Sequence, residues 1–232
     1  MTEENNLETY LSISPKRYGI YLIDKHKLDI LYQSEEKIND DLIDFNSLSK
    51  FLDNNIFKIE KFTEKFIKNI YVIIENQKVF NSHIGIKKKN YDDIINMGYL
   101  EKTLRETKDL FIKNYQDQNL MHMIIDNYLI NGKKYTNFDS EIKTRDFCLV
   151  INFISISNNL SDHLEKILEK YQIKIKKYLN EKYIKNFFIG QKTEFPVMIC
   201  KILNGINQNE VQLVPKNRKN KGFFEKFFHL FS

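Results

Sequence analysis

A mixed α+β fold is predicted for this chain of 232 residues. Short runs rich in Ile, Val, Tyr and Phe alternate with longer segments whose apolar residues recur at helical spacing. Hydrophobic residues make up 42% of the chain and charged residues 29%, a balance that supports a folded core. No stretch approaches the roughly 18 consecutive apolar residues that a transmembrane helix needs. The polar opening does not resemble a signal peptide, and two distant cysteines favour a reducing compartment.

The amino-terminal part predicts a hairpin followed by a helix. Residues 1–16 are polar and are expected to form a flexible leader. Two apolar runs, Tyr18–Ile23 and Leu28–Tyr32, flank a polar four-residue turn, a pattern typical of a β-hairpin. A helix is expected to begin near Asn46 or Ser47, either of which can cap its first turn.

The middle of the chain predicts three strands and a long helix. Ile70–Ile74 is typical of a buried strand, and Val79–Ile84 is expected to pair antiparallel with it across a tight turn. Tyr91–Asn114 carries the longest helical pattern. Leu120–Ile130 is expected to be a further strand that ends at an Asn131-Gly132 turn.

The carboxyl-terminal part predicts a central strand and two helices. Phe147–Ile156 is the most apolar segment of the chain, and Leu160–Tyr171 follows it with an amphipathic helical pattern. Phe195–Leu203 has a proline in its first turn and a glycine shortly after its end, so we expect a short helix there. Residues 206–222 are polar and basic and predict a linker.

The net charge of +5 is concentrated at the carboxyl end. Five basic residues and one acidic residue lie between Lys216 and Ser232, which leaves residues 1–215 with a net charge of +1. A nucleic-acid-binding domain is expected to carry its excess charge as a patch on the folded body. The distribution therefore predicts a basic tail and no nucleic-acid partner.

Sequence motifs for catalysis are sparse. The chain has seven glycines and no glycine-rich phosphate-binding motif, so few backbone segments can approach a phosphate closely. Asp24 and Asp29 flank the first predicted turn and would suit acid–base chemistry, but carboxylates beside a turn are usually only solvated. We therefore expect no catalytic residue, no cofactor and no metal. The histidines lack zinc-ligand spacing and are His26, His83, His122, His163 and His229.

The last ten residues predict an amphipathic helix. On a helical wheel its three polar side chains fall within about 100°, and its large apolar side chains fill the opposite arc. With the basic segment before it, this pattern is typical of a helix lying in an anionic membrane interface. A helix docked on the body, or in the groove of a protein partner, is the alternative. The expected membrane-binding residues are Phe223, Phe224, Phe227, Phe228, Leu230, Phe231, Lys219, Lys221 and Lys226.

The order of these segments resembles the FtsA family of bacterial cell-division proteins. That family is actin-like, carries an inserted SHS2 domain and ends in an amphipathic membrane-targeting helix. The most specific piece is LMHMIIDNYLINGKK at residues 120–134, which resembles a strand and turn of the family. The other matching stretches are Tyr18–Tyr32, Asp41–Phe45, Ile70–Ile86, Asn90–Asn114, Asp146–Ile175, Phe195–Gly205 and Lys219–Ser232.

The resemblance implies a division of the chain into domains. A strand-helix-strand-strand domain of the SHS2 type is expected at residues 41–134. It would be inserted in a reduced actin-like, ribonuclease H-like subdomain formed by residues 17–40 and 135–205. The basic linker, 206–222, and the membrane-targeting helix, 223–232, would follow.

Two departures from the family pattern bear on nucleotide binding. Where the family has a glycine-containing loop that cradles phosphates, this chain reads Asp24-Lys25-His26-Lys27. The second actin-like lobe, which closes the nucleotide cleft in the family and contains its FtsZ-binding surface, has no counterpart in the sequence. ATP binding is therefore not expected.

The resemblance implies a non-enzymatic scaffold or adaptor of the cell-division machinery, peripheral to the cytoplasmic face of the inner membrane. Expected partners are anionic lipid, division proteins of the FtsA type with FtsZ or FtsN among them, and a second copy of the chain. The alternatives are an actin-like adaptor of pilus assembly, a basic RNA-associated domain and an ATPase. The nearly neutral body disfavours the RNA-associated domain, and the missing glycine loop disfavours the ATPase.

Overall fold

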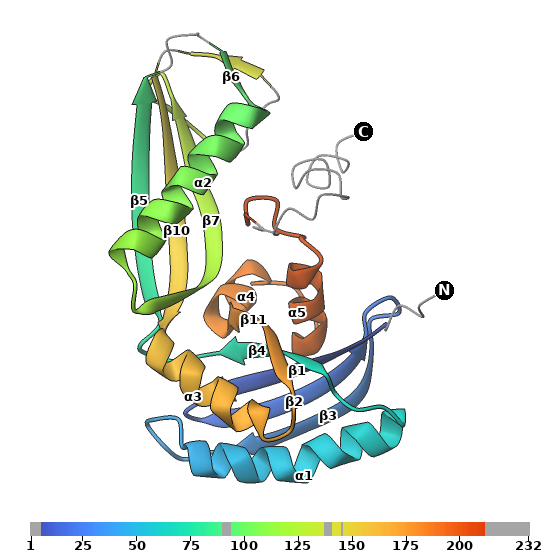
Figure 1. The fold of residues 1–232 in the computed structure, drawn as a ribbon. Helices are drawn as coiled ribbons and strands as arrows, with labels where there is room; N and C mark the ends of the chain where they lie inside the picture. Colours follow the sequence, from blue (N-terminus) through green and yellow to red (C-terminus); the bar gives the residue numbers. More distant parts are fainter. Residues whose placement is uncertain (1–5, 90–93, 137–140, 145, 212–232) are drawn as a thin grey trace. The chain divides into compact units, whose positions relative to one another are not determined.

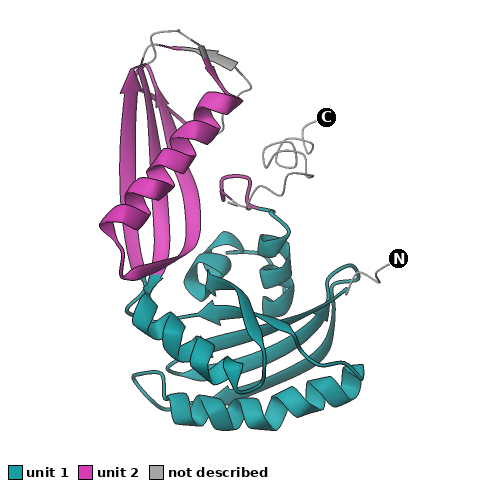
Figure 2. Ribbon diagram, in the orientation of Figure 1, with its two compact units in different colours: residues 1–79, 156–206 teal, residues 80–155, 207–232 magenta. Residues whose placement is uncertain are grey.

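The computed structural model describes residues 6–89, 94–136, 141–144 and 146–211. The chain divides into two compact units, shown by the colours of Figure 2. Unit 1 comprises residues 1–79 and 156–206, and unit 2 comprises residues 80–155 and 207–232. The mixed α+β class predicted from the sequence is confirmed, because each unit combines a sheet with helices (Figure 1).

Unit 1 is built on a five-stranded sheet in the order β11-β4-β1-β2-β3. Consecutive antiparallel pairing joins β1 (Leu7–Ser14), β2 (Arg17–Asp24) and β3 (Asp29–Lys37). On the other side of β1, β4 (Asn69–Ile74) and β11 (Lys174–Asn180) run parallel to it. The predicted hairpin is thus confirmed as β2–β3, the second hairpin of the chain.

The expectation of a flexible leader over residues 1–16 is wrong for its described part. Leu7–Ser14 forms β1, which pairs with β2 on one side and with β4 on the other. The segment reads as polar because Thr9, Ser12 and Ser14 interrupt its apolar residues, yet all three are buried. Backbone pairing on both sides makes β1 central despite this composition.

The predicted pairing of Ile70–Ile74 with Val79–Ile84 is also wrong, although the buried strand itself is confirmed. This strand, β4, pairs in parallel with β1 and β11, whereas β5 (Phe80–Lys89) pairs antiparallel with β10. A strand that is apolar on both faces needs cover on both faces, and a parallel position between helices supplies it.

Helices cover both faces of the sheet in unit 1. The aromatic ring of Tyr18 on β2 lies 6.0 Å from that of Phe51 on α1 (Phe45–Thr63). Successive strand residues point to opposite faces. Tyr21 accordingly belongs to the other core, with α4 (Glu181–Phe187) and the predicted helix α5 (Phe195–Leu203), which is confirmed. The helix α3 (Asn158–Glu169) packs against β11.

The cap of α1 differs from the prediction. Its first turn is capped by Asp44, whose carboxylate accepts hydrogen bonds from the Asn46 N–H at 2.9 Å and the Ser47 hydroxyl at 2.6 Å. These bonds, of which the one from Ser47 is the largest contribution, lower the pKa of Asp44. The helix then continues without a break to Thr63, because its buried residues keep one phase from Leu48 to Ile59.

Unit 2 contains a four-stranded sheet in the order β5-β10-β7-β8, packed against the helix α2 (Met97–Asn114). The strands are β5, β10 (Asp146–Ser157), β7 (Gln118–Ile130) and β8 (Lys133–Tyr135). A small pair, β6 (Ile94–Asn96) and β9 (Glu141–Lys143), lies apart from this sheet. The predicted strand at 147–156 is confirmed as buried, and Phe153 stacks on Phe111 at a centroid distance of 4.6 Å.

The predicted Asn131-Gly132 turn is confirmed between β7 and β8. Asn131 has a φ of 51° and Gly132 a φ of 79°, the left-handed values that a two-residue hairpin turn requires at both positions. The predicted helix at 91–114 begins only at Met97, where the side chain of Asn96 caps it by accepting from the Tyr99 N–H.

The expected domain boundaries differ from the observed units. The helix α1 and the strand β4 were expected in the inserted domain at 41–134, but both belong to unit 1, whose sheet includes β4. The segment inserted in unit 1 is instead 80–155. The first residues of the expected linker contact the folded body. Glu210 forms a β-bridge with Ile124 on β7, and Val211 donates its backbone N–H to Met123 O at 2.8 Å. The remainder from residue 212, including the expected helix at 223–232, lies outside the described residues.

Candidate functional site

The membrane-binding residues predicted from the sequence all lie outside the described residues, so their prediction stays a prediction. Within the described ranges, no helix is both long and apolar enough to span a membrane. The same part of the chain holds no group of three metal-ligating side chains.

The predicted acid–base candidates at the β2–β3 turn have a structural role in this fold. The Asp24 carboxylate accepts hydrogen bonds from the backbone N–H groups of His26 at 2.9 Å and Lys27 at 3.1 Å. These backbone bonds lower the pKa of Asp24, the bond from Lys27 contributing most. Asp24 therefore stabilises the turn as a carboxylate, and Asp29 pairs opposite it in the hairpin.

The carboxyl edge of the parallel strands in unit 1 is the usual ligand position in open α/β sheets, and here it holds a buried ionic network. Glu181, 1% exposed, follows β11. Its carboxylate accepts from the Ser12 hydroxyl at 2.8 Å, the Arg17 guanidinium at 2.9 Å and the Lys185 ammonium at 2.5 Å. Arg17 also reaches Glu35, at 3.2 Å.

This network neutralises charge at that edge. Two cations, Arg17 and Lys185, share one buried carboxylate, and each also lies over the ring of Phe195, at 5.6 and 5.5 Å from its centroid. Burial is the largest single effect and lowers the pKa of Arg17, but the combined interactions with Glu181, Tyr21 and Glu35 outweigh it, so the pKa is raised overall. These ion pairs stabilise unit 1, and they pair both cations with the carboxylate of Glu181. Sequence analysis missed it because its members are far apart along the chain.

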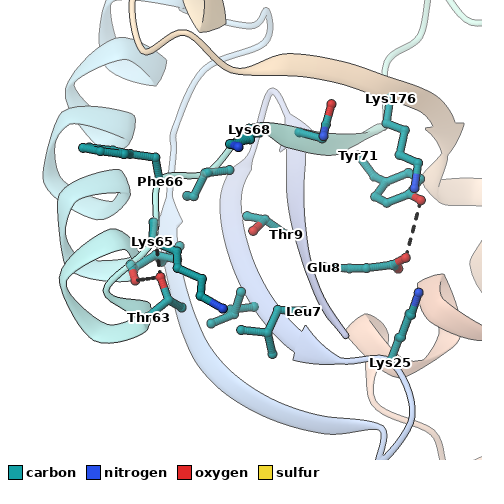
Figure 3. A pocket seen from close by; sticks show the side chains of 14 residues that line it. Leu7, Glu8, Thr9, Lys25, Thr63, Lys65, Phe66, Lys68, Tyr71 and Lys176 are labelled. Atoms are coloured by element: carbon teal, nitrogen blue, oxygen red, sulfur yellow. Dashed lines mark hydrogen bonds between the residues drawn. The ribbon is translucent and has the colours of Figure 1, made fainter. Parts of the chain in front are cut away.

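A pocket of about 190 Å³ lies at the opposite, amino edge of the same parallel strands (Figure 3). Its apolar wall includes Leu7, Leu22 and Ile67, and the end of α1 contributes Ile59 and Thr63. Its charged lining consists of Glu8 and four lysines, namely Lys25, Lys65, Lys68 and Lys176. This excess of cations favours an anionic or amphiphilic ligand over a cationic one.

The single carboxylate of the pocket is held by tyrosines. The Tyr10 hydroxyl donates to Glu8 at 2.7 Å, and the Tyr71 hydroxyl lies 3.5 Å from the other Glu8 oxygen. Burial raises the pKa of both tyrosines, so each remains a protonated donor at neutral pH. Lys176 lies 5.0 Å from the Tyr71 ring centroid, and its hydrogen bond with Tyr71 raises the pKa of this lysine. The pocket has the chemistry of a binding site and lacks an activated nucleophile among these groups.

The edge strand β5 in unit 2 is a second candidate site. Ten residues long, it pairs with β10 along its length, and the sheet order places it at the edge of the described sheet. Exposed and half-buried side chains alternate along it. The strand was predicted from its sequence, but its position at an edge depends on which strands pair and was not predictable from β5 alone.

The end of the described chain, residues 209–211, makes backbone contacts with β7. The Ile125 N–H donates to Asn209 O at 2.8 Å, beside the Glu210 bridge to Ile124. The buried side chains of His122 and Glu210 meet at 2.8 Å. This pair gives the buried His122 side chain a polar partner, and the backbone contacts of Asn209 and Glu210 hold the end of the described chain against β7.

Comparisons with known proteins give matches among solved structures alone. No protein-family model matches the chain, and no curated protein matches it. A chain of the PilM-PilN type IV pilus biogenesis complex matches with 8% identity and a TM-score of 0.43, covering 78% of this chain and 49% of that one. The cytoplasmic domain of EpsL, an inner-membrane component of the Vibrio cholerae type II secretion system, matches with 8% identity, coverages of 77% and 58%, and a TM-score of 0.38.

A third match is a Bacteroides thetaiotaomicron protein described as having an actin-like ATPase fold. It shows 14% identity and a TM-score of 0.35 over 81% of this chain and 58% of that one. The chain thus spans between 49% and 58% of the length of these three solved chains. Because each TM-score is below 0.5, the function proposed for this chain rests on its own residues, and the resemblance to FtsA remains a prediction.

Proposed function

We propose that this chain is a non-enzymatic, membrane-associated adaptor of the kind implied by its resemblance to FtsA, acting in bacterial cell division. The observation that carries the proposal is the edge strand β5, which offers ten residues of backbone at the border of the sheet in unit 2. An extended segment of a partner can add to such an edge by main-chain hydrogen bonds. Membrane association is contributed, in this proposal, by the predicted helix at 223–232.

Several features of β5 suit a regulated contact. Its exposed positions are polar or small, and its end carries the consecutive lysines Lys87, Lys88 and Lys89. Lysine on an edge strand opposes indiscriminate pairing between copies. Lys87 and Lys88 contact the carboxylates of Asp146 and Glu106, so that end of the strand is also held in place. A partner strand with acidic residues would match this end best.

Site-specific photo-cross-linking in the full chain tests the proposal. Gly85 is the preferred site, because it is exposed and a Cβ atom added there meets no atom within 4 Å. Lys102 on α2, also exposed, is the control site. We expect adducts with a division protein or a second copy from position 85 and not from position 102. Equal adducts from both positions, or none from position 85, would contradict the proposal.

A further inference from the structure

The strongest unassigned surface of the chain is the carboxyl end of α1 and the turn that follows it. Three phenylalanines are exposed there within ten residues: Phe57 by 69%, Phe62 by 60% and Phe66 by 83%. Lysines alternate with them. We call this surface the α1 corner and define it as Phe57, Lys58, Lys61, Phe62, Lys65 and Phe66.

Most of the helical part of the α1 corner faces away from the core of unit 1. At 100° per residue, Phe57, Lys58 and Lys61 fall within an arc of about 100°. The buried residues of the same helix occupy a separate arc of about 140°, bounded by Phe51 and Ile56. Phe57 is therefore not part of the core-facing stripe. Phe62 falls within the buried arc, but it lies in the last turn of the helix and is 60% exposed.

The turn after α1 is held in place, so Phe66 is presented to solvent by an ordered backbone. Glu64 ends the helix in the left-handed conformation with a φ of 54°. The Thr63 hydroxyl lies 3.0 Å from Lys65 O, and the Ile67 N–H donates to the Glu60 carboxylate at 3.0 Å. Ile67 is buried, whereas Phe66 is 83% exposed; it borders the pocket, and its ring points away from the strands there (Figure 3).

We infer that the α1 corner is a second membrane-contacting surface, specific for anionic lipid. Exposed aromatic side chains flanked by lysines are suited to the headgroup region, where the rings enter the interface and the ammonium groups meet phosphates. Residues 57–68 contain four lysines and two glutamates, and one of these glutamates is bonded to the turn. The inference rests on the proposed membrane association, and it assigns part of that association to the folded body.

A three-residue motif of the α1 corner recurs in the predicted membrane helix. The triplet Glu-Lys-Phe occurs at 60–62 and 64–66 in the α1 corner and again at 225–227 in the predicted membrane helix. The same side chains thus recur where a membrane contact was predicted on other grounds. The opposite end of α1 carries the reverse charge, with exposed Leu42 close to Asp40, Asp41 and Asp44. A membrane contact through the α1 corner is therefore favoured electrostatically over one through that end.

Tryptophan fluorescence can test this contact in the full chain, which contains no tryptophan. Phe66→Trp places a single reporter in the α1 corner, and Leu42→Trp places a matched one, 67% exposed in the native residue, at the acidic end. With vesicles containing phosphatidylglycerol, we expect a shift of the emission to shorter wavelength and quenching by brominated acyl chains for Phe66→Trp only. Vesicles of phosphatidylcholine alone should give neither effect. A response from both variants, or from neither, would overturn the inference.

A binding measurement separates this inference from the proposed function. Phe62→Ser with Phe66→Ser removes two exposed rings, and we expect the vesicle partition coefficient to fall at least about tenfold. Asp41→Ser with Leu42→Ser is the control and should leave partitioning unchanged. If wild-type protein sediments with the vesicles while the corner variant does so equally well, the inference fails and the adaptor proposal stands. If wild-type protein does not sediment, both fail.

Discussion

Glu181 is a buried carboxylate at the centre of the ionic network in unit 1. It is 1% exposed and accepts from Ser12, Arg17 and Lys185. A buried carboxylate is tolerated only where cations and hydrogen-bond donors surround it. Removing its side chain would leave the Ser12 hydroxyl without this acceptor and Arg17 without its buried counter-ion.

We predict that Glu181→Ala lowers the free energy of unfolding of unit 1 by about 3 kcal/mol. Urea denaturation followed by circular dichroism measures this change. The control is Asp41→Ala, which removes the exposed ion pair between Asp41 and Lys16 and should leave the midpoint unchanged. A Glu181→Ala protein as stable as wild type would show that Arg17 and Lys185 are adequately solvated without the carboxylate.

At the scale of single elements, two strand glycines illustrate how local packing determines the effect of a residue. Gly19 on β2 lies beside Tyr21, and a Cβ added there would stand 2.6 Å from the tyrosine oxygen. That hydroxyl donates to Glu35 at 2.5 Å, and the tyrosine is fully buried, so the ring cannot easily move. By contrast, a Cβ added to Gly85 on β5 would meet no atom within 4 Å.

We expect opposite effects from the same substitution at these two glycines. Gly19→Ala should destabilise unit 1 by about 1–3 kcal/mol through overpacking. Gly85→Ala should stabilise unit 2 by about 0.5 kcal/mol, because glycine weakens a strand through backbone entropy. Thermal unfolding of the two variants provides the comparison. A fall in melting temperature for Gly85→Ala would mean that the glycine of β5 is needed for close backbone approach.

At the scale of the whole molecule, the proposed adaptor function predicts that the chain does not bind ATP. The β2–β3 turn has no glycine and is closed by Asp24, and Arg17 and Lys185 at the carboxyl edge are bound to Glu181. Isothermal titration calorimetry with Mg-ATP should therefore show no saturable heat. Micromolar binding would contradict this expectation and favour the ATPase alternative.

The predicted membrane helix gives a second prediction at this scale. Phe224→Glu with Phe228→Glu places two charges in the middle of its apolar arc, where insertion into a membrane would require burying them. We expect this variant to lose sedimentation with anionic vesicles at low protein density, while the melting temperature of the body stays unchanged. Earlier melting would instead indicate a helix packed on the body. Binding as tight as that of wild type would show that this helix is not the main anchor.

The sequence alone determined where most regular elements form. The apolar run of β10, the turn at Asn131 and Gly132 and the helix at 195–203 were predictable, because periodicity and turn chemistry act over a few neighbouring residues. The sequence also contained the Glu-Lys-Phe triplets of the α1 corner, but whether their phenylalanines can contact a membrane depends on their exposure in the fold.

Tertiary structure decided which strands pair and which charges meet. The polar residues of β1 led to the prediction of a flexible leader. Its pairing with β2 and β4 shows that it is a central strand. Ser12, Arg17 and Glu181 come together because two parallel neighbours of β4 end at the same edge. The exposure of Phe57 likewise follows from which face of α1 the sheet covers. Such relations depend on contacts between distant segments, and local sequence patterns carry little information about them.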